Sequence, residues 1–196
     1  MANTIAVPNG LGKAYTYENW MKITDPTSNQ YKLREQAFTK GVASYDSGGY
    51  ARINGRYVVA VTEKFGKVGD YIDIQTANGK TINAVIGDIK RVTDARANEW
   101  GHEHGQVVVE YVTNWDDHHE NRTGDGGIIS ITNTGKNFLS GDYMSGTDAT
   151  TQSGLSSGLW DSVLTWIITT VIIIFLVVVA VWFFCKAFNI KIGGLL

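Results

Sequence analysis

The sequence is poor in residues that crosslink, kink or strongly charge a protein. It has one cysteine and two prolines among 196 residues, and its 17 basic and 19 acidic side chains leave a formal net charge of −2. A single cysteine excludes a disulfide within the chain. The balanced charge supplies no basic surface of the kind that holds a phosphate backbone, so we expect no nucleic-acid partner.

Several catalytic motifs are also absent. The sequence contains no G-x-S-x-G, no P-loop and no C-x-x-C. Cys185 lies at the end of an apolar run, where a packed or lipid-facing residue is expected, with acylation as the alternative. A cysteine protease is therefore excluded, and no cofactor is expected. The first twenty residues lack a charged start followed by an apolar core, so no secretory signal peptide is predicted.

One long apolar segment lies near the C-terminus. Residues 163–184 carry no charge, and about 20 apolar residues suffice to cross a hydrocarbon core of roughly 30 Å. Trp160 and Trp166 near its start and Trp182 near its end resemble interfacial aromatic belts. We predict a transmembrane helix that contacts the bilayer through 163–184. The alternative is a helix that stays buried in an oligomer until it is released.

The charges around this segment predict an unusual orientation. Lys186 and Lys191 follow it and Asp161 precedes it, which places the C-terminus in the cytoplasm and the large N-terminal region outside. A cytosolic chain with only a terminal anchor would keep that region inside the cell. The conflict disappears if the protein enters the membrane from outside, as a virion component does.

The region before the apolar segment is rich in glycine and in short alternating patterns. Two Asn-Gly pairs, at 54–55 and 78–79, predict tight hairpin turns. Ser28 is expected to cap a helix over 29–38. Frequent short strands predict a mainly β fold, a barrel or a sandwich. The strands are expected at 56–62, 71–76, 81–86, 106–113 and 127–132.

The composition also predicts domain boundaries. Residues 133–158 are rich in Gly, Ser, Thr and Asn, which is typical of a flexible linker. An ordered arm in an assembly is the equal alternative. The expected parts are an N-terminal lead (1–14), a β domain (15–132), the linker (133–158), the transmembrane helix (159–187) and a short tail (188–196).

Asp88 is the first candidate for chemistry. It follows an apolar strand, and the preceding Gly87 leaves room for a ligand. A carboxylate at a strand exit can act as a general acid if burial raises its pKa. The alternative is an aspartate that accepts hydrogen bonds from backbone N–H groups of a turn.

A second candidate cluster contains Glu99, His102, Glu103 and His104. The two histidines share a face if this segment is a strand, and with a third, distant ligand they could hold a metal. The alternatives are a turn with satisfied histidines, or a histidine that positions a substrate near Asp88. The acids and histidines at 116–120 predict a solvated loop or, more weakly, a hard-cation site. No metal site is favoured.

The segment "GRYVVAVTEKFGKVGDYIDIQTANGKTINAVIGDIK" (55–90), followed by "HGQVVVEYV" (104–112), resembles the double-psi β-barrel superfamily. That group includes three-aspartate cell-wall domains, the rare lipoprotein A group, MltA-type lytic transglycosylases and domains of phage and mobile-element proteins of Gram-positive bacteria. The resemblance covers about residues 15–115. It implies a small six-stranded double-psi-like β-barrel, here followed by the linker and one C-terminal transmembrane α-helix.

The resemblance also implies roles for particular residues. The acid that protonates the glycosidic oxygen in the lytic enzymes corresponds to Asp88, and a later strand acid corresponds to Glu110. His102 or Glu110 would assist or orient the acid. The sequence departs from the pattern at two points: the usual D-x-G is D-I-K (88–90), and a glutamate replaces the later aspartate.

A small membrane-lysis factor of the holin or spanin kind fits poorly with one terminal span after a large extramembrane domain. Two other functions are therefore favoured. The first is a membrane-inserting, cell-wall-engaging protein of a phage virion or tail, whose barrel binds or cleaves peptidoglycan. The second is a structural subunit of a virion or secretion assembly, with neighbouring copies shielding its apolar C-terminus until membrane contact. Both place the protein in the virion or the host membrane, with the β domain on the outer side and with homo-oligomer or virion neighbours as partners.

Overall fold

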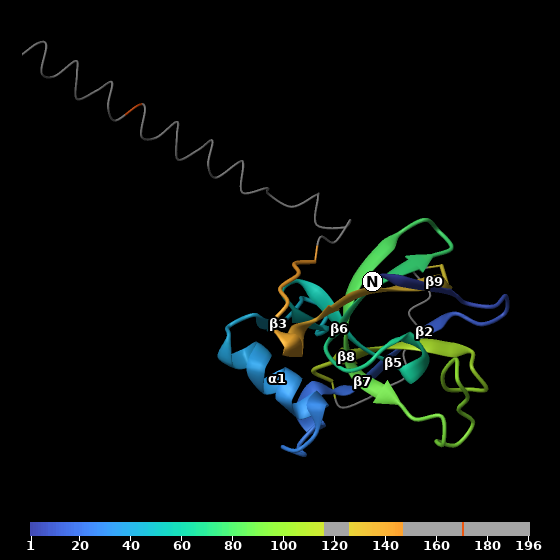
Figure 1. The fold of residues 1–196 in the computed structure, drawn as a ribbon, viewed down its shortest axis with the longest axis horizontal. Helices are drawn as coiled ribbons and strands as arrows, with labels where there is room; N and C mark the ends of the chain where they lie inside the picture. The colour runs from blue at the N-terminus through green and yellow to red at the C-terminus, as the bar shows by residue number, and fades with distance from the viewer. Residues whose placement is uncertain (116–125, 147–169, 171–196) are drawn as a thin grey trace, which may run out of the picture. The chain divides into compact units, whose positions relative to one another are not determined.

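A computed structural model describes residues 1–115, 126–146 and 170. The chain divides into two units, Met1–Thr151 and Gln152–Leu196. The first unit is mainly β, with one α-helix in its described residues, and this confirms the mainly β class expected from the sequence (Figure 1).

The strands of the described region follow one another with few interruptions. The strands are β1 (Asn3–Ala6), β2 (Lys13–Asn19), β3 (Ala43–Tyr45), β4 (Ala51–Ile53), β5 (Arg56–Thr62), β6 (Asp70–Thr76), β7 (Thr81–Lys90), β8 (Val107–Thr113) and β9 (Ile128–Asn137). In the described residues α1 (Asn29–Thr39) is the one α-helix. The short 3-10 turn η1 (Trp20–Lys22) lies between β2 and α1, η2 (Glu63–Phe65) connects β5 to β6, and η4 (Phe138–Ser140) follows β9.

These strands form one mixed sheet. Six of them follow the order β2-β8-β5-β7-β6-β9, with parallel pairs β2/β8 and β5/β7 and antiparallel pairs elsewhere. At the start of β9, the N–H of Ile128 donates to the carbonyl of Gly12, immediately before β2, at 2.8 Å. A Cβ at Gly12 would lie 2.3 Å from the Ile128 carbonyl oxygen. The two ends of the six-strand path therefore meet where only glycine fits.

Alternate residues of the strands fill two apolar layers. Val59 of β5 and Ile86 of β7 belong to one layer, whereas Val58 and Val85 belong to the other, which also contains Leu33 of α1. Because successive side chains of a strand point to opposite faces, a continuous apolar run such as "YVVAV" fills both layers. Figure 1 shows α1 on one side of the strands.

The helix begins where its capping residue predicts. The Ser28 hydroxyl accepts a hydrogen bond from the N–H of Tyr31 at 3.1 Å, which satisfies a donor that the first helical turn leaves unpaired. The observed helix, Asn29–Thr39, extends one residue beyond the expected range. The buried guanidinium of Arg34 donates to the carbonyls of Trp20 and Ile23, so α1 is tied to η1.

Residues 133–146 do not form the expected linker. β9 continues to Asn137 instead of ending at 132, and Phe138 is buried. The amide groups of Asn133 and Asn137 donate to the carboxylate of Asp70. Polar composition suggested a solvated segment here, but these asparagines satisfy a buried acid. The rest of the predicted linker, 147–158, lies outside the described residues.

The expected N-terminal lead contains strand residues. Residues 3–6 form β1, which pairs antiparallel with β9, and β2 begins within the lead at Lys13. This pairing joins residues that are more than 120 positions apart, so no local pattern predicts it.

Within the ranges 1–115 and 126–146, the structure contains no helix long and apolar enough to cross a membrane. Except for residue 170, the predicted transmembrane helix (159–187) and its bilayer-contacting part (163–184) lie outside the described residues, as does the tail (188–196).

Candidate functional site

A bulge in β7 positions Asp88. Val59 pairs with Ile86 and the next residue, Ala60, pairs with Asp88, so Gly87 is the extra residue. A Cβ at Gly87 would lie 2.2 Å from Cγ1 of Val58. The sequence predicted Asp88 just beyond a strand, but β7 continues to Lys90 because the bulge restores the pairing after Gly87.

Two neutral donors orient the half-buried Asp88 carboxylate. Its Oδ1 accepts hydrogen bonds from Nε2 of Gln30 at 3.0 Å and from the N–H of Ile89 at 2.7 Å. Gln30 lies in the first turn of α1, so the helix start and the strand end meet at this acid. Both contacts use Asp88 as a hydrogen-bond acceptor, which is the role expected of a structural aspartate.

The other two predicted site residues do come together. Nδ1 of His102 lies 3.0 Å from Oε1 of Glu110. Glu110 lies on β8, and its side chain is 3% exposed. His102 is held next to β8 by hydrogen bonds between its backbone and that of Val107.

The segment around His102 is a turn rather than a strand. Glu103 and His104 both have positive φ angles, 50° and 59°, so His102 and His104 do not share a strand face. In the part of the chain that the structure describes, no three His, Cys, Asp or Glu residues are grouped to hold a metal. The metal alternative for this segment therefore has no support, whereas the acidic segment 116–120 lies outside the described residues.

Lys90 completes the cluster and was missed as a site residue. Its Nζ lies 3.3 Å from Oε1 of Glu110 and donates to the carbonyl of Val107 at 2.8 Å, and its side chain is 1% exposed. The available signal was the strand period: positions 88 and 90 point to the same face. We name Lys90, His102 and Glu110 the buried charge cluster.

The buried charge cluster shifts the pKa of each member. The hydrogen bond to Glu110 raises the pKa of His102, although burial opposes it. Burial lowers the pKa of Lys90 to about 8 against the attraction of Glu110. Burial alone raises the pKa of Glu110, but the hydrogen bond from His102 and the charge of Lys90 outweigh it and the net pKa is lowered. Glu110 is thus the shared anion of two cationic partners.

A cavity of about 210 Å³ opens beside this cluster. Tyr15, Arg96 and Glu103 line it together with His102 and Glu110. The second ring nitrogen of His102, Nε2, lies 3.5 Å from a carboxylate oxygen of Asp94. An imidazolium held between two carboxylates at a cavity can donate a proton to a bound ligand, and its carboxylate partners stabilise the charged form.

The strand register relates the two carboxylates that the sequence singled out. Ala60 of β5 pairs with Asp88 on one side and with Glu110 on the other. Cross-strand partners project to the same face, and strands are about 4.8 Å apart, so the two backbones are roughly 10 Å apart across Ala60. Asp88 and Glu110 therefore share a face of the sheet.

The chain matches no protein-family model, no curated protein and no solved structure.

Proposed function

We propose that the described β domain binds cell-wall peptidoglycan and belongs to a membrane-inserting component of a phage virion or tail. The observation that carries this proposal is the register that sets Asp88 and Glu110 on either side of Ala60. These are the two positions at which the resembling double-psi barrels keep acids. The apolar sequence at 163–184 supplies the membrane-inserting part of the proposal.

The strand pairing supports a six-stranded double-psi barrel as the fold. The path β2-β8-β5-β7-β6-β9 contains two parallel pairs and returns to its start through the Ile128–Gly12 hydrogen bond. Parallel strands joined without a helical crossover are uncommon in small β domains. The fold alone does not specify an activity, so the proposal rests on the residues at the site.

Binding fits the contacts better than cleavage does. A lytic transglycosylase needs one acid, in contrast to the two carboxylates of most glycosidases, and Asp88 is the acid that the resemblance implies. In the structure Asp88 accepts hydrogen bonds from Gln30 and Ile89, so these contacts use its carboxylate as an acceptor. The proposal therefore has two forms: binding alone, and the more demanding form in which Asp88 acts as a general acid and the domain cleaves peptidoglycan.

Zymography and sedimentation with purified cell-wall sacculi test both forms. The full chain in detergent is compared with Asp88→Asn, with Glu110→Gln and with a control, Glu99→Gln. The control removes a 65%-exposed carboxylate paired with Lys64. Sedimentation of the wild type without clearing establishes binding. Clearing that only Asp88→Asn abolishes establishes cleavage. If the wild type neither sediments with the sacculi nor clears them, the proposal is contradicted.

A structural subunit is the second candidate. The buried ion pair between Lys90 and Glu110 favours this role. A buried ion pair can serve to specify a fold without taking part in any chemistry. In that role, copies of the chain shield the apolar segment until membrane contact. The prediction is a ring or bundle of high mass in detergent, measured by light scattering, and a strictly monomeric chain at high concentration contradicts it.

A further inference from the structure

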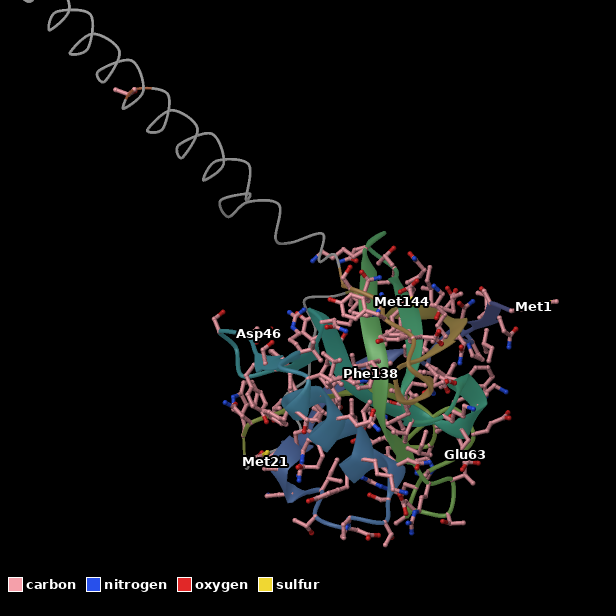
Figure 2. All side chains as sticks on the ribbon, turned by 60° about the vertical axis from the view of Figure 1, so that its left-hand side comes forward. Met1, Met21, Asp46, Glu63, Phe138 and Met144 are labelled. Carbon is pink, nitrogen blue, oxygen red and sulfur yellow. The ribbon has the colours of Figure 1, made fainter. Side chains whose placement is uncertain are left out.

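A second, larger cavity lies between the start of α1, the turn at η2 and the end of β7. Its volume is about 600 Å³, which is within the usual range for small-molecule pockets. Asn29 and Gln30 contribute from α1, Glu63 and Lys67 from the η2 region, and Arg91 from the residue after β7. We name it the α1–β7 cavity, and Glu63 marks its position in Figure 2.

One wall of this cavity is held in place by Asp70. Its Oδ2 accepts from the N–H of Lys67 at 3.0 Å and from Asn133 at 2.9 Å, and its Oδ1 accepts from Asn137 at 2.6 Å. Gly66 packs so closely here that a Cβ would lie 2.7 Å from Oδ2 of Asp70. The backbone that carries Lys67 is therefore preorganised, which lowers the entropic cost of binding a ligand.

The rim of the cavity carries cations that are not used inside the protein. Lys67 and Arg91 are exposed, and among the described residues neither forms an ion pair. Lys64, by contrast, pairs with Glu99 at 3.1 Å. The Asp70 carboxylate is occupied by its internal donors, so Glu63 is the remaining acid among the described residues that line the cavity.

We propose that the α1–β7 cavity binds an anionic saccharide, a sugar that carries a carboxylate or a phosphate. Lys67 and Arg91 pair with the acidic group, because a guanidinium presents several donors that match either anion. The side-chain amides of Asn29 and Gln30 bind the sugar hydroxyl groups. This assignment rests on the proposed function, because the proposed function makes a cell-wall polymer the source of the ligand.

Gln30 connects this cavity to the candidate acid. It lines the α1–β7 cavity and also donates to Oδ1 of Asp88. A sugar seated in the cavity is therefore one side chain away from Asp88, on the opposite side of Ala60 from Glu110. Substitution of Gln30 by alanine should weaken saccharide binding and change the environment of Asp88 together.

The test is an NMR titration of the ¹⁵N-labelled full chain in detergent. The probes are N-acetylmuramic acid, which carries a carboxylate, glucose 6-phosphate, and the neutral N-acetylglucosamine. We expect at least one anionic sugar to shift the amide signals of residues 29–30, 67 and 91, at concentrations where the neutral sugar has little effect. The double variant K67Q/R91Q should weaken this binding at least about tenfold.

A charge-matched variant provides the control. K80Q/K136Q also removes two exposed positive charges, and neither lysine lines the α1–β7 cavity. It should bind the anionic sugar like the wild type, and all three proteins should keep the same dispersed spectrum. Equal weakening by both double variants, equal binding of all three sugars, or no shift at the cavity overturns the proposal.

The two anionic probes separate the sources of the ligand, and sedimentation with sacculi separates this inference from the proposed function. Preference for the carboxylate sugar supports a peptidoglycan origin, and preference for the phosphate supports a phosphate-containing wall polymer. Sedimentation with sacculi but no shift at the cavity refutes the site and leaves the function standing. Shifts at the cavity without sedimentation support the site and refute the function.

Discussion

Two buried acids of this domain are stabilised in different ways. Asp70 is bound by the neutral amides of Asn133 and Asn137 and by a backbone N–H. Glu110 is bound by Lys90 and His102, both of which can carry a proton. A carboxylate held by neutral donors keeps its partners at any moderate pH, whereas one held by titratable cations does not. The comparison predicts a rigid region around Asp70 and a pH-responsive region around Glu110.

The largest expected effect comes from removing Glu110 alone. Glu110→Leu leaves the charge of Lys90 buried without its partner, and we expect a loss of about 3–5 kcal/mol in the free energy of unfolding. Urea denaturation measures it. The double variant K90M/E110L removes both charges and should recover most of the loss. A single variant within about 1 kcal/mol of the wild type would show that the pair is not buried as described.

Removal of Asp70 should cost less. Asp70→Ala leaves two side-chain amides and one backbone N–H without their acceptor, for which we expect about 2–3 kcal/mol. The loss should be nearly the same at pH 6 and pH 8 because its donors do not titrate in this range. A loss that changes strongly between these two pH values would break the contrast with Glu110.

The pH dependence of stability should arise from the buried charge cluster. The pKa of His102 is raised above its ordinary value of 6.5, so the folded state binds the proton more tightly than the unfolded state. The stabilisation of the folded state by His102 is complete below about pH 6.5 and is lost as the pH rises through the raised pKa of the folded state. His102→Gln should remove this loss of stability, measured by urea denaturation between pH 5 and 8, whereas His104→Gln should leave it unchanged.

Lys90 should make stability depend on pH in the opposite direction, and at higher pH, than His102 does. Burial lowers its pKa from 10.5 to about 8, so between these values the unfolded state binds more protons than the folded state. Stability should therefore rise with pH from about 8 towards 10.5 through this residue. The variant K90M should lack that rise in urea denaturation. A rise of the same size in K90M would assign it to another group.

The smallest effect should come from the helix cap that supports Asp88. Ser28→Ala removes the acceptor for the N–H of Tyr31 and should cost about 1 kcal/mol. Because Gln30 follows the cap, the Asp88 region should lose amide hydrogen-exchange protection while the buried charge cluster keeps it. Equal loss of protection in both regions would show that they open together.

Several features of the fold were predictable because their signals are local. The Asn54-Gly55 pair forms the β4–β5 turn, with both residues at positive φ, and Ser28 caps α1. The turn needs two residues that tolerate positive φ, and the cap needs one short side-chain acceptor. The sequence singled out His102 and Glu110 only as residues that would assist or orient Asp88, and their hydrogen bond to each other was not predicted.

Other features had no local signal. Composition marked 133–146 as a linker, because nothing in the segment reveals that its asparagines bind Asp70 more than sixty residues earlier. Lys90 looked like a departure from a motif, yet its ammonium is the buried partner of Glu110. Both errors come from polar residues whose partners lie on distant strands.

The amino-acid sequence by itself determined the mainly β class, the helix start, the tight turns and the location of its long apolar segment, since each depends on a few neighbouring residues. The tertiary structure alone decided that β1 pairs with β9, that Gly87 forms a bulge, and that Lys90 and His102 share Glu110. Those outcomes depend on the register between distant strands, where a shift of one residue would turn every side chain to the other face.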